Sequence, residues 1–263
     1  MLRGLLIWMI PFFAIGQEAT GVLYPHDERV LSFSQSGLVK RVPVEPGSLV
    51  AKGDVLVQLD DRAKALEVSR RDKVRADRFE ISSVTEQLKT AKAQLVSAEK
   101  LYAEAQVVSL DELRRLRLDV TSLQARLGQL ESDSERTRIE YDMAVLDYEQ
   151  QTLTSPMAGT VTQITRDEGE WISAGDPIAE VVDTSQLELR ANIEATSVWR
   201  RVERGMMLLV RGEQGQTREG LVTYVSPVAD ASSGLVEVHF LLNNSDAAFL
   251  AGTQGIVSLP HGQ

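Results

Sequence analysis

One pattern occurs twice in this chain of 263 residues, and the repeat restricts the possible folds more than any other feature. The segment GLVKRVPVEPGSLVAKGDVLVQLD, from residue 37, matches GTVTQITRDEGEWISAGDPIAEVVD, from residue 159, at a constant offset of 122 residues. The valines and isoleucines favour short strands, and glycine is typical of tight turns that need a positive φ. We expect two halves that form one small β-sandwich, each covering the apolar face of the other. The glycines expected at turns are Gly37, Gly47, Gly53, Gly159, Gly169 and Gly175.

Residues 62–152, between the two halves, are predicted to form an antiparallel coiled-coil hairpin. From residue 62 to residue 151 there is no proline and a single glycine, Gly128. Apolar residues recur there at a spacing of three and four, which is typical of coiled-coil helices. In the first arm they are Ile81, Val84, Leu88, Ala91, Leu95, Ala98, Tyr102 and Ala105. In the second arm the pattern comprises Leu113, Leu116, Val120, Leu123, Leu127, Leu130, Ser134, Thr137, Tyr141, Ala144 and Tyr148, with polar Ser134 and Thr137 interrupting it.

A helix-start signal lies near the middle of this insertion. Ser109 and Glu112 fit a capping box, in which a serine accepts from the backbone of the residue three positions later. Because the two sandwich halves have to meet, the chain must return to its starting point, and we expect the turn near residues 106–109. Each arm of about 43 residues would then extend ~65 Å.

The other segments are predicted to consist mainly of strands. Residues 17–35 are expected to form an N-terminal strand segment, residues 36–61 and 153–184 the two sandwich halves, and residues 185–260 a small β-barrel. Within the barrel we expect a short helix in 194–203 and strands at 187–193, 207–211, 217–226, 234–242 and 255–259. The predicted fold class is α+β, elongated and modular: a split lipoyl/biotinyl-like sandwich with an inserted hairpin, followed by a barrel.

The composition argues against several kinds of function. The chain has no cysteine, which excludes disulfides, thiolate metal sites and a lipidated N-terminal cysteine. Its net charge of −10 argues against binding along a nucleic-acid backbone. The three histidines, His26, His239 and His261, are scattered without the spacing of metal ligands. We therefore predict no catalytic residue, no metal site and no enzyme activity.

The N-terminus has the features of a secretory signal. Met1, Leu2 and Arg3 form a short positive region, and an apolar stretch from Leu5 to Ile15 follows it. Cleavage after Gly16 would leave Gln17 as the first mature residue. The alternative is a retained membrane anchor, although a span needs about 20 apolar residues. We expect residues 1–16 to be a cleaved signal peptide and the mature chain to be exported.

This arrangement resembles the periplasmic adaptors, or membrane fusion (haemolysin-D-like) proteins, of bacterial tripartite efflux systems. The resemblance rests on two half-motifs of a lipoyl- or biotinyl-type domain, residues 37–60 and 155–183, which a helical hairpin separates. Pro156 adds to the second half-motif. The segment from Leu187 to Leu259 is similar to the β-barrel of the family. This similarity includes the positions of Gly205, Gly220, Pro227 and Gly252.

The resemblance implies a passive connector between an inner-membrane transporter and an outer-membrane duct. A transporter of the resistance-nodulation-division (RND) type is favoured over an ABC transporter, and copies of the chain are expected to assemble into a ring. RND-associated adaptors commonly continue into a membrane-proximal domain, which this chain is expected not to complete. No cofactor is expected, because the hairpin replaces the turn that would carry a modified lysine.

The hairpin tip is the candidate partner-binding surface, since Val107 and Val108 lie where there is no core to enter. The expected contact residues are Tyr102, Gln106, Val107, Val108, Ser109, Leu110 and Leu113. Family tips often carry Arg, Leu and Ser at set spacing; Ser109 matches, whereas Ala98 and Tyr102 occupy the other two positions. Two alternatives stay open: a coiled-coil envelope protein without a pump, and a carrier component of an acyl or carboxyl transfer enzyme.

Overall fold

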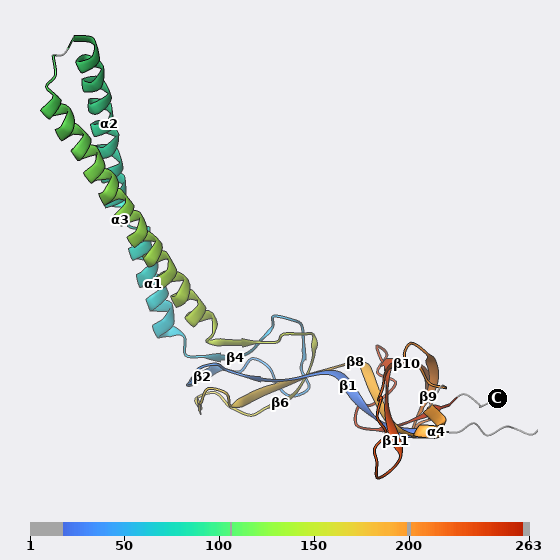
Figure 1. Cartoon of the computed structure of the whole chain (residues 1–263). Coiled ribbons are helices and arrows are strands. Elements are labelled where there is room, and N and C mark those ends of the chain that lie inside the picture. Colours follow the sequence, from blue (N-terminus) through green and yellow to red (C-terminus); the bar gives the residue numbers. More distant parts are fainter. Residues whose placement is uncertain (1–17, 106, 199–200, 260–263) are drawn as a thin grey trace, which may run out of the picture.

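The computed structural model describes residues 18–105, 107–198 and 201–259. Figure 1 shows an elongated molecule in which a long helical hairpin projects from a β-sandwich, and a β-barrel lies on the other side of the sandwich. The expected signal peptide, residues 1–16, lies outside the described residues. Within the described ranges, no helix combines the length and the apolar character that crossing a membrane requires.

Two facing sheets form the sandwich. One has the strand order β5-β4-β2-β7 and consists of β5 (Thr152–Thr154), β4 (Val55–Leu59), β2 (Gly37–Arg41) and β7 (Trp171–Ile172). The strands opposite are parts of β1 (Glu18–Ser32) and β8 (Pro177–Glu194), with β6 (Gly159–Ile164) and β3 (Leu49–Val50). The core between them is aliphatic apart from Phe33, and includes Val39, Leu56, Leu59, Val161, Ile172 and Ile178.

The two sequence halves occupy equivalent places in the two sheets. Leu38 of β2 pairs with Trp171 of β7, and at the 122-residue offset Thr160 of β6 pairs with Leu49 of β3. In the same way Gly37 pairs with Ile172, and Gly159 pairs with Val50. Each half therefore contributes a short strand to the sheet that is built mainly by the other half, which explains why neither apolar face is left open.

The glycines of the repeat serve two different purposes. Gly47, Gly53, Gly169 and Gly175 have φ values between 84° and 94°, the left-handed region that a turn of this kind needs. The prediction of turns at Gly37 and Gly159 is wrong, because these residues begin strands β2 and β6. At residue 159 a Cβ would lie 2.7 Å from the Val182 carbonyl oxygen, which leaves no room for a side chain. At residue 37 it would lie 3.0 Å from Leu59 Cδ1, so that the leucine side chain would have to shift.

The predicted helical hairpin is confirmed, with one difference. The second arm is a single helix, α3 (Leu110–Glu149), of 40 residues and ~60 Å. The first arm, expected to be continuous, consists of α1 (Arg62–Ala76) and α2 (Phe79–Ala105). Asp77 breaks it by adopting an extended conformation, with ψ of 103°, and its carboxylate accepts a hydrogen bond from the Phe79 backbone at 3.2 Å.

The hairpin changes character along its length. Val84, Leu88 and Ala98 of α2 are buried against α3, whereas α1 buries none of its side chains. Instead, α1 contacts α3 through polar pairs: Lys64 Nζ lies 2.9 Å from Asp147 Oδ2, Arg71 pairs with Glu140, and the Arg75 guanidinium lies over the Tyr141 ring. The polar positions interrupting the α3 seam, Ser134 and Thr137, line a small cavity next to the break at Asp77.

Six strands close into a barrel in the order β1-β12-β9-β10-β11-β8, and β8 pairs again with β1. Besides β1 and β8 these are β9 (Met207–Gly212), β10 (Thr217–Val225), β11 (Leu235–Asn243) and β12 (Gln254–Ser258), with a short helix α4 (Ala195–Val198). The sixth strand comes from the N-terminal segment. Because β1 and β8 pair from Gly21–Ala191 to Ser32–Pro177, they run through both the barrel and the sandwich and join the two.

Candidate functional site

The far end of the hairpin exposes apolar side chains. Helix α2 ends at Ala105 and α3 begins at Leu110. Between them Val107 is 76% exposed, Val108 is half-buried, and the flanking Leu110 is 46% exposed. Tyr102, one turn before the end of α2, is also partly exposed, and Gln106 lies outside the described residues. The tip therefore presents a small apolar surface to solvent, as an unoccupied partner site would.

Ser109 fixes the connection between this loop and α3. Its side chain accepts a hydrogen bond from the Glu112 backbone N–H at 3.1 Å, and its carbonyl oxygen accepts from Leu113 N–H at 3.2 Å. Asp111 and Glu112 add negative charge in the first turn, which stabilises the positive end of the helix. The cap thus fixes the start of α3 directly behind Val107 and Val108.

Leu113 does not belong to the exposed tip, although the sequence pattern grouped it there. It is 2% exposed and lies in the apolar seam of the hairpin. Leu113 starts the buried seam of α3, whereas Leu110, one turn nearer the tip, is the first residue of the helix and is 46% exposed. The candidate surface accordingly consists of Tyr102, Val107, Val108, Ser109 and Leu110.

Charges behind the tip are largely paired with one another. Arg117 of α3 contacts Glu99 of α2 at 2.8 Å and joins the two arms. Arg114 pairs with Asp111 at 3.1 Å within α3. These exposed pairs contribute little to stability. They leave the apolar residues as the groups of the tip that are available to a partner.

The base of the hairpin is held by a buried carboxylate. Asp61, directly before α1, is 8% exposed and accepts hydrogen bonds from Lys40 Nζ at 2.6 Å and Gln58 Nε2 at 3.0 Å. The bond from Lys40 is the largest cause of a lowered pKa of Asp61, against the opposing effect of burial. Asp61 therefore anchors the first arm to strand β2 of the sandwich.

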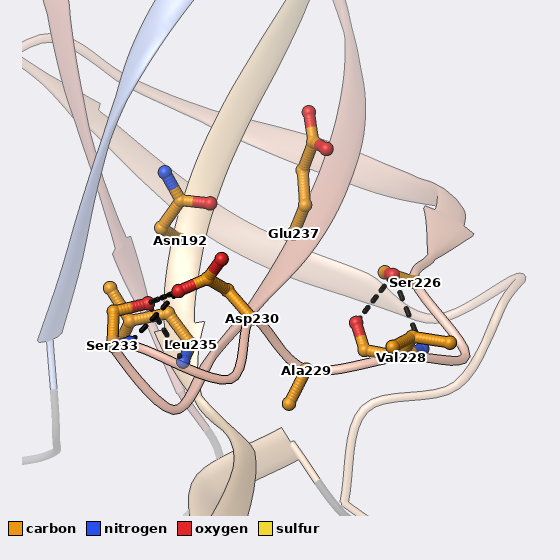
Figure 2. A pocket seen from close by; sticks show the side chains of 8 residues that line it. All are labelled: Asn192, Ser226, Val228, Ala229, Asp230, Ser233, Leu235 and Glu237. Atoms are coloured by element: carbon orange, nitrogen blue, oxygen red, sulfur yellow. Dashed lines mark hydrogen bonds between the residues drawn. The ribbon is translucent and has the colours of Figure 1, made fainter.

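A cavity of about 430 Å³ lies on the barrel, where Figure 2 shows it lined by the β10–β11 loop and by Asn192 and Glu237. Asp230 in this loop accepts hydrogen bonds from the hydroxyls of Ser232 and Ser233, at 2.6 and 2.8 Å, and these bonds help to lower its pKa to about 2. The Asp230 carboxylate therefore stabilises the β10–β11 loop through these hydrogen bonds. In the described ranges, no three His, Cys, Asp or Glu residues are grouped as a metal site would require.

The fold combines a long helical hairpin with a sandwich that shares two strands with a barrel. Residues 34–184 match the model of the RND MFP (membrane fusion protein), barrel-sandwich hybrid domain, which is more than half of the chain. The chain therefore belongs to the membrane fusion protein family, the periplasmic adaptors. Members of this family are adaptors without enzymatic activity, so the prediction of a non-enzyme is confirmed.

Relatives extend the likeness beyond this domain. The nodulation protein NolF of Rhizobium meliloti (strain 1021) is 25% identical over 236 residues, 88% of this chain and 60% of the relative. The macrolide export protein MacA of Escherichia coli O157:H7 is 27% identical over 171 residues, 62% of this chain and 45% of the relative. The chain thus spans about half to three-fifths of the length of these two relatives.

Solved structures share the fold. MacA from Actinobacillus actinomycetemcomitans superimposes with a TM-score of 0.67 at 20% identity, covering 95% of this chain and 80% of that one. The membrane fusion protein Spr0693 from Streptococcus pneumoniae R6 gives a TM-score of 0.62 at 13% identity, covering 94% and 100%. At these identities the likeness shows the fold, and the family assignment rests on the matching domain model.

Proposed function

We propose that the chain is a periplasmic adaptor that connects an inner-membrane transporter to an outer-membrane duct and so supports the export of small molecules. The macrolide export protein among its relatives supports small-molecule export. The name of the matching family model favours an RND transporter over an ABC transporter. Substrate is not altered chemically, and the chain acts by sealing and aligning a conduit.

The exposed tip carries this proposal. Val107, at 76% exposure, lies at the end of an arm of ~60 Å, and Leu110 and Tyr102 flank it. A helix end with apolar side chains suits insertion between the helices of a partner, since helix-in-groove recognition uses such anchors. An arm of this length suits a contact far from the sandwich and barrel, which would lie toward the transporter.

Export is part of the same proposal. Residues 1–16 act as a cleaved signal peptide, and the mature chain stays at the inner membrane through its transporter. Several copies form a ring, because one hairpin cannot enclose a channel.

The chain has no cysteine, so a single probe can be placed at will. We would introduce Val107→Cys, attach a photo-cross-linker in the periplasm of cells that are extruding compounds, and identify the captured protein by mass spectrometry. Capture of an outer-membrane duct is the expected result. Val96→Cys is the matched control, because Val96 is 66% exposed but lies nine residues before the end of α2, away from the loop. Capture of other copies of the chain alone would instead indicate a coiled-coil envelope scaffold.

A further inference from the structure

The end of the barrel that is farther from the sandwich contains an apolar cavity, well separated from the hairpin tip. Strand β8 enters the barrel from the sandwich and ends at Glu194, which pairs with Leu235 at the start of β11. Helix α4 and the β10–β11 loop therefore lie together at this far end, where Figure 1 shows α4. Between them lies a cavity of about 310 Å³, here called the end cavity.

The end cavity is lined almost entirely by aliphatic side chains. The described residues that line it are Ala195, Val198, Val202, Val225, Ser226, Pro227, Ala229 and Val236. Val198, Val202 and Val236 are buried members of the barrel core, and Ala195, Val225 and Ala229 pack against that core. The walls of the cavity are thus continuous with the apolar core of the barrel.

Hydrogen bonds hold these walls in place. At the start of α4, Ala195 N–H donates to the Gly234 carbonyl oxygen at 3.1 Å, which ties the helix to the end of the loop. Ser226 N–H donates to the Glu237 carbonyl oxygen at 2.8 Å, and the Ser226 hydroxyl donates to the Val228 carbonyl oxygen at 2.8 Å. The cavity is therefore already formed before any ligand enters, as most ligand sites are.

The end cavity offers few hydrogen bonds to an occupant. Ser226 has the sole polar side chain among the described lining residues, and its hydroxyl is already bonded to Val228. A water molecule in a cavity needs about two to four polar partners, which these side chains do not supply. By comparison, an engineered apolar cavity of roughly 150 Å³ stays free of water and binds benzene. An apolar molecule is therefore a better occupant than water.

The size of the cavity limits the size of that molecule. Ligand sites in proteins typically measure about 300–1,000 Å³. At about 310 Å³ the end cavity lies at the lower end of this range. It therefore suits a compound of about two linked aromatic ring systems.

Charged groups lie on the other side of the β10–β11 loop. The polar cavity of about 430 Å³ shares Ser226 and Ala229 with the end cavity, but its lining also includes Asp230 and Glu237. Figure 2 shows the Ala229 methyl group pointing away from the side on which the carboxylates of Asp230 and Glu237 lie. A charged group in the end cavity would thus lose its hydration without gaining a partner from the described lining residues, which favours an uncharged ligand.

We propose that the end cavity binds a small uncharged apolar molecule, of about the size of two linked aromatic ring systems. The proposal goes beyond the adaptor function and does not rest on it, because the site lies on the barrel and is complete in a single chain. It gives the chain a direct contact with small molecules, which a passive connector does not require.

Fluorescence titration of the purified chain tests this site. The probe is N-phenyl-1-naphthylamine, an uncharged compound whose emission rises in apolar surroundings, and we expect saturable binding of one probe per chain. The anionic 8-anilino-1-naphthalenesulfonate, which has the same rings, should bind about tenfold or more weakly, because its sulfonate would lose hydration in the cavity. Absence of saturable binding by the uncharged probe would overturn the proposal, as would equal affinity for the anionic one. The first result is also expected if a side chain of a partner protein is the natural occupant.

Filling the cavity shows whether the probe binds there. Ala229→Phe places a ring in the cavity from the loop, and Ala195→Leu fills it from the opposite wall; each should weaken probe binding about tenfold or more. Ala231→Phe is the matched control, because Ala231 is exposed in the same loop and does not line the cavity, and it should keep the parent affinity.

The variants should stay folded by circular dichroism, since residues 229 and 231 lie in a loop and the Ala195 side chain borders open space. Parent affinity in both filling variants would overturn the proposal, because the probe would then bind elsewhere on the chain. Capture by the Val107 probe in cells reports the adaptor function, so the two proposals can fail separately.

Discussion

Gly47 donates its backbone N–H to the carbonyl oxygen of Val161 at 2.7 Å, across the boundary between the two sequence halves. The equivalent bond, from Gly169 N–H to the Val39 carbonyl oxygen, is 2.9 Å long. Each half therefore closes a turn onto a strand of the other half. Since residues 62–152 separate them in the chain, these reciprocal bonds help to explain how a sandwich stays closed around a long insertion.

The turn glycines should resist substitution because of their backbone conformation. Gly47 and Gly169 have φ of 94° and 87°, and no atom lies within 4 Å of a Cβ built at either position. Replacement by alanine should lower the free energy of unfolding by about 1–2 kcal/mol, as expected for an L-residue in the left-handed region. Urea unfolding measures this. Asparagine, which tolerates positive φ, should cost less; an equal cost for both substitutions would contradict the explanation.

Gly128 should show the opposite behaviour. It lies within α3, and a Cβ at this position would meet no atom within 4 Å. Gly128→Ala should therefore stabilise the hairpin by about 0.5–1 kcal/mol, because alanine restricts the unfolded chain more than glycine does. Thermal unfolding followed at 222 nm would report the change. A decrease in stability would show that the close approach of another chain requires the glycine.

The Lys40–Asp61 pair should make the hairpin base sensitive to acid. The pKa of Asp61 is lowered in the folded state, so its contribution to stability is present above the pKa of the unfolded state and is lost as the pH falls through the folded-state pKa. Asp61→Asn should therefore lose less stability than the parent chain when the pH is lowered from about 5 to about 3. Lys40→Met should show the same reduced acid dependence, because it removes the main cause of the shift. Acid dependence equal to that of the parent chain in both variants would contradict this role.

A charge at the hairpin tip should separate function from folding. Val107→Asp should leave the free energy of unfolding within about 0.5 kcal/mol of the parent value, because the side chain is exposed. Resistance to an exported compound should nevertheless fall about tenfold or more, since docking would bury an unpaired charge. Val96→Asp should retain resistance, because Val96 is also largely exposed, at 66%, but lies nine residues before the end of α2. Normal resistance in the Val107→Asp strain would remove Val107 from the contact.

Local patterns predicted the hairpin well. The cap at Ser109 and the apolar seam through Leu88 and Val120 depend on residues three or four positions apart. The turn between Ala105 and Leu110 follows from this cap and from the return of the chain to the other half of the sandwich. A helix brings such residues together whatever the rest of the chain does. The break at Asp77 was not predicted. The polar residues around Asp77 weaken the three-and-four apolar pattern, but they do not form a recognisable signal for the end of a helix.

The repeat predicted that two halves cover one another, because matched strands with apolar faces must be paired. It did not predict that the neighbouring backbone of Val182 requires glycine at residue 159, or that Gly37 lies against the side chain of Leu59, since those neighbours belong to other strands. Leu113 was grouped with the tip by its position in the sequence, whereas the packing of α2 against α3 buries it.

The sequence by itself thus determined most of the helices and strands, the cap at Ser109 and the order of the modules, since these depend on short-range periodicity, turn chemistry and the repeat. Only the tertiary structure decided that β1 and β8 run through both sandwich and barrel, because their pairing joins residues more than 140 positions apart. It alone assembled Leu38, Leu66 and Trp171 around one cavity. Such surfaces depend on long-range strand pairing and on the direction in which each helix faces, which no local pattern records.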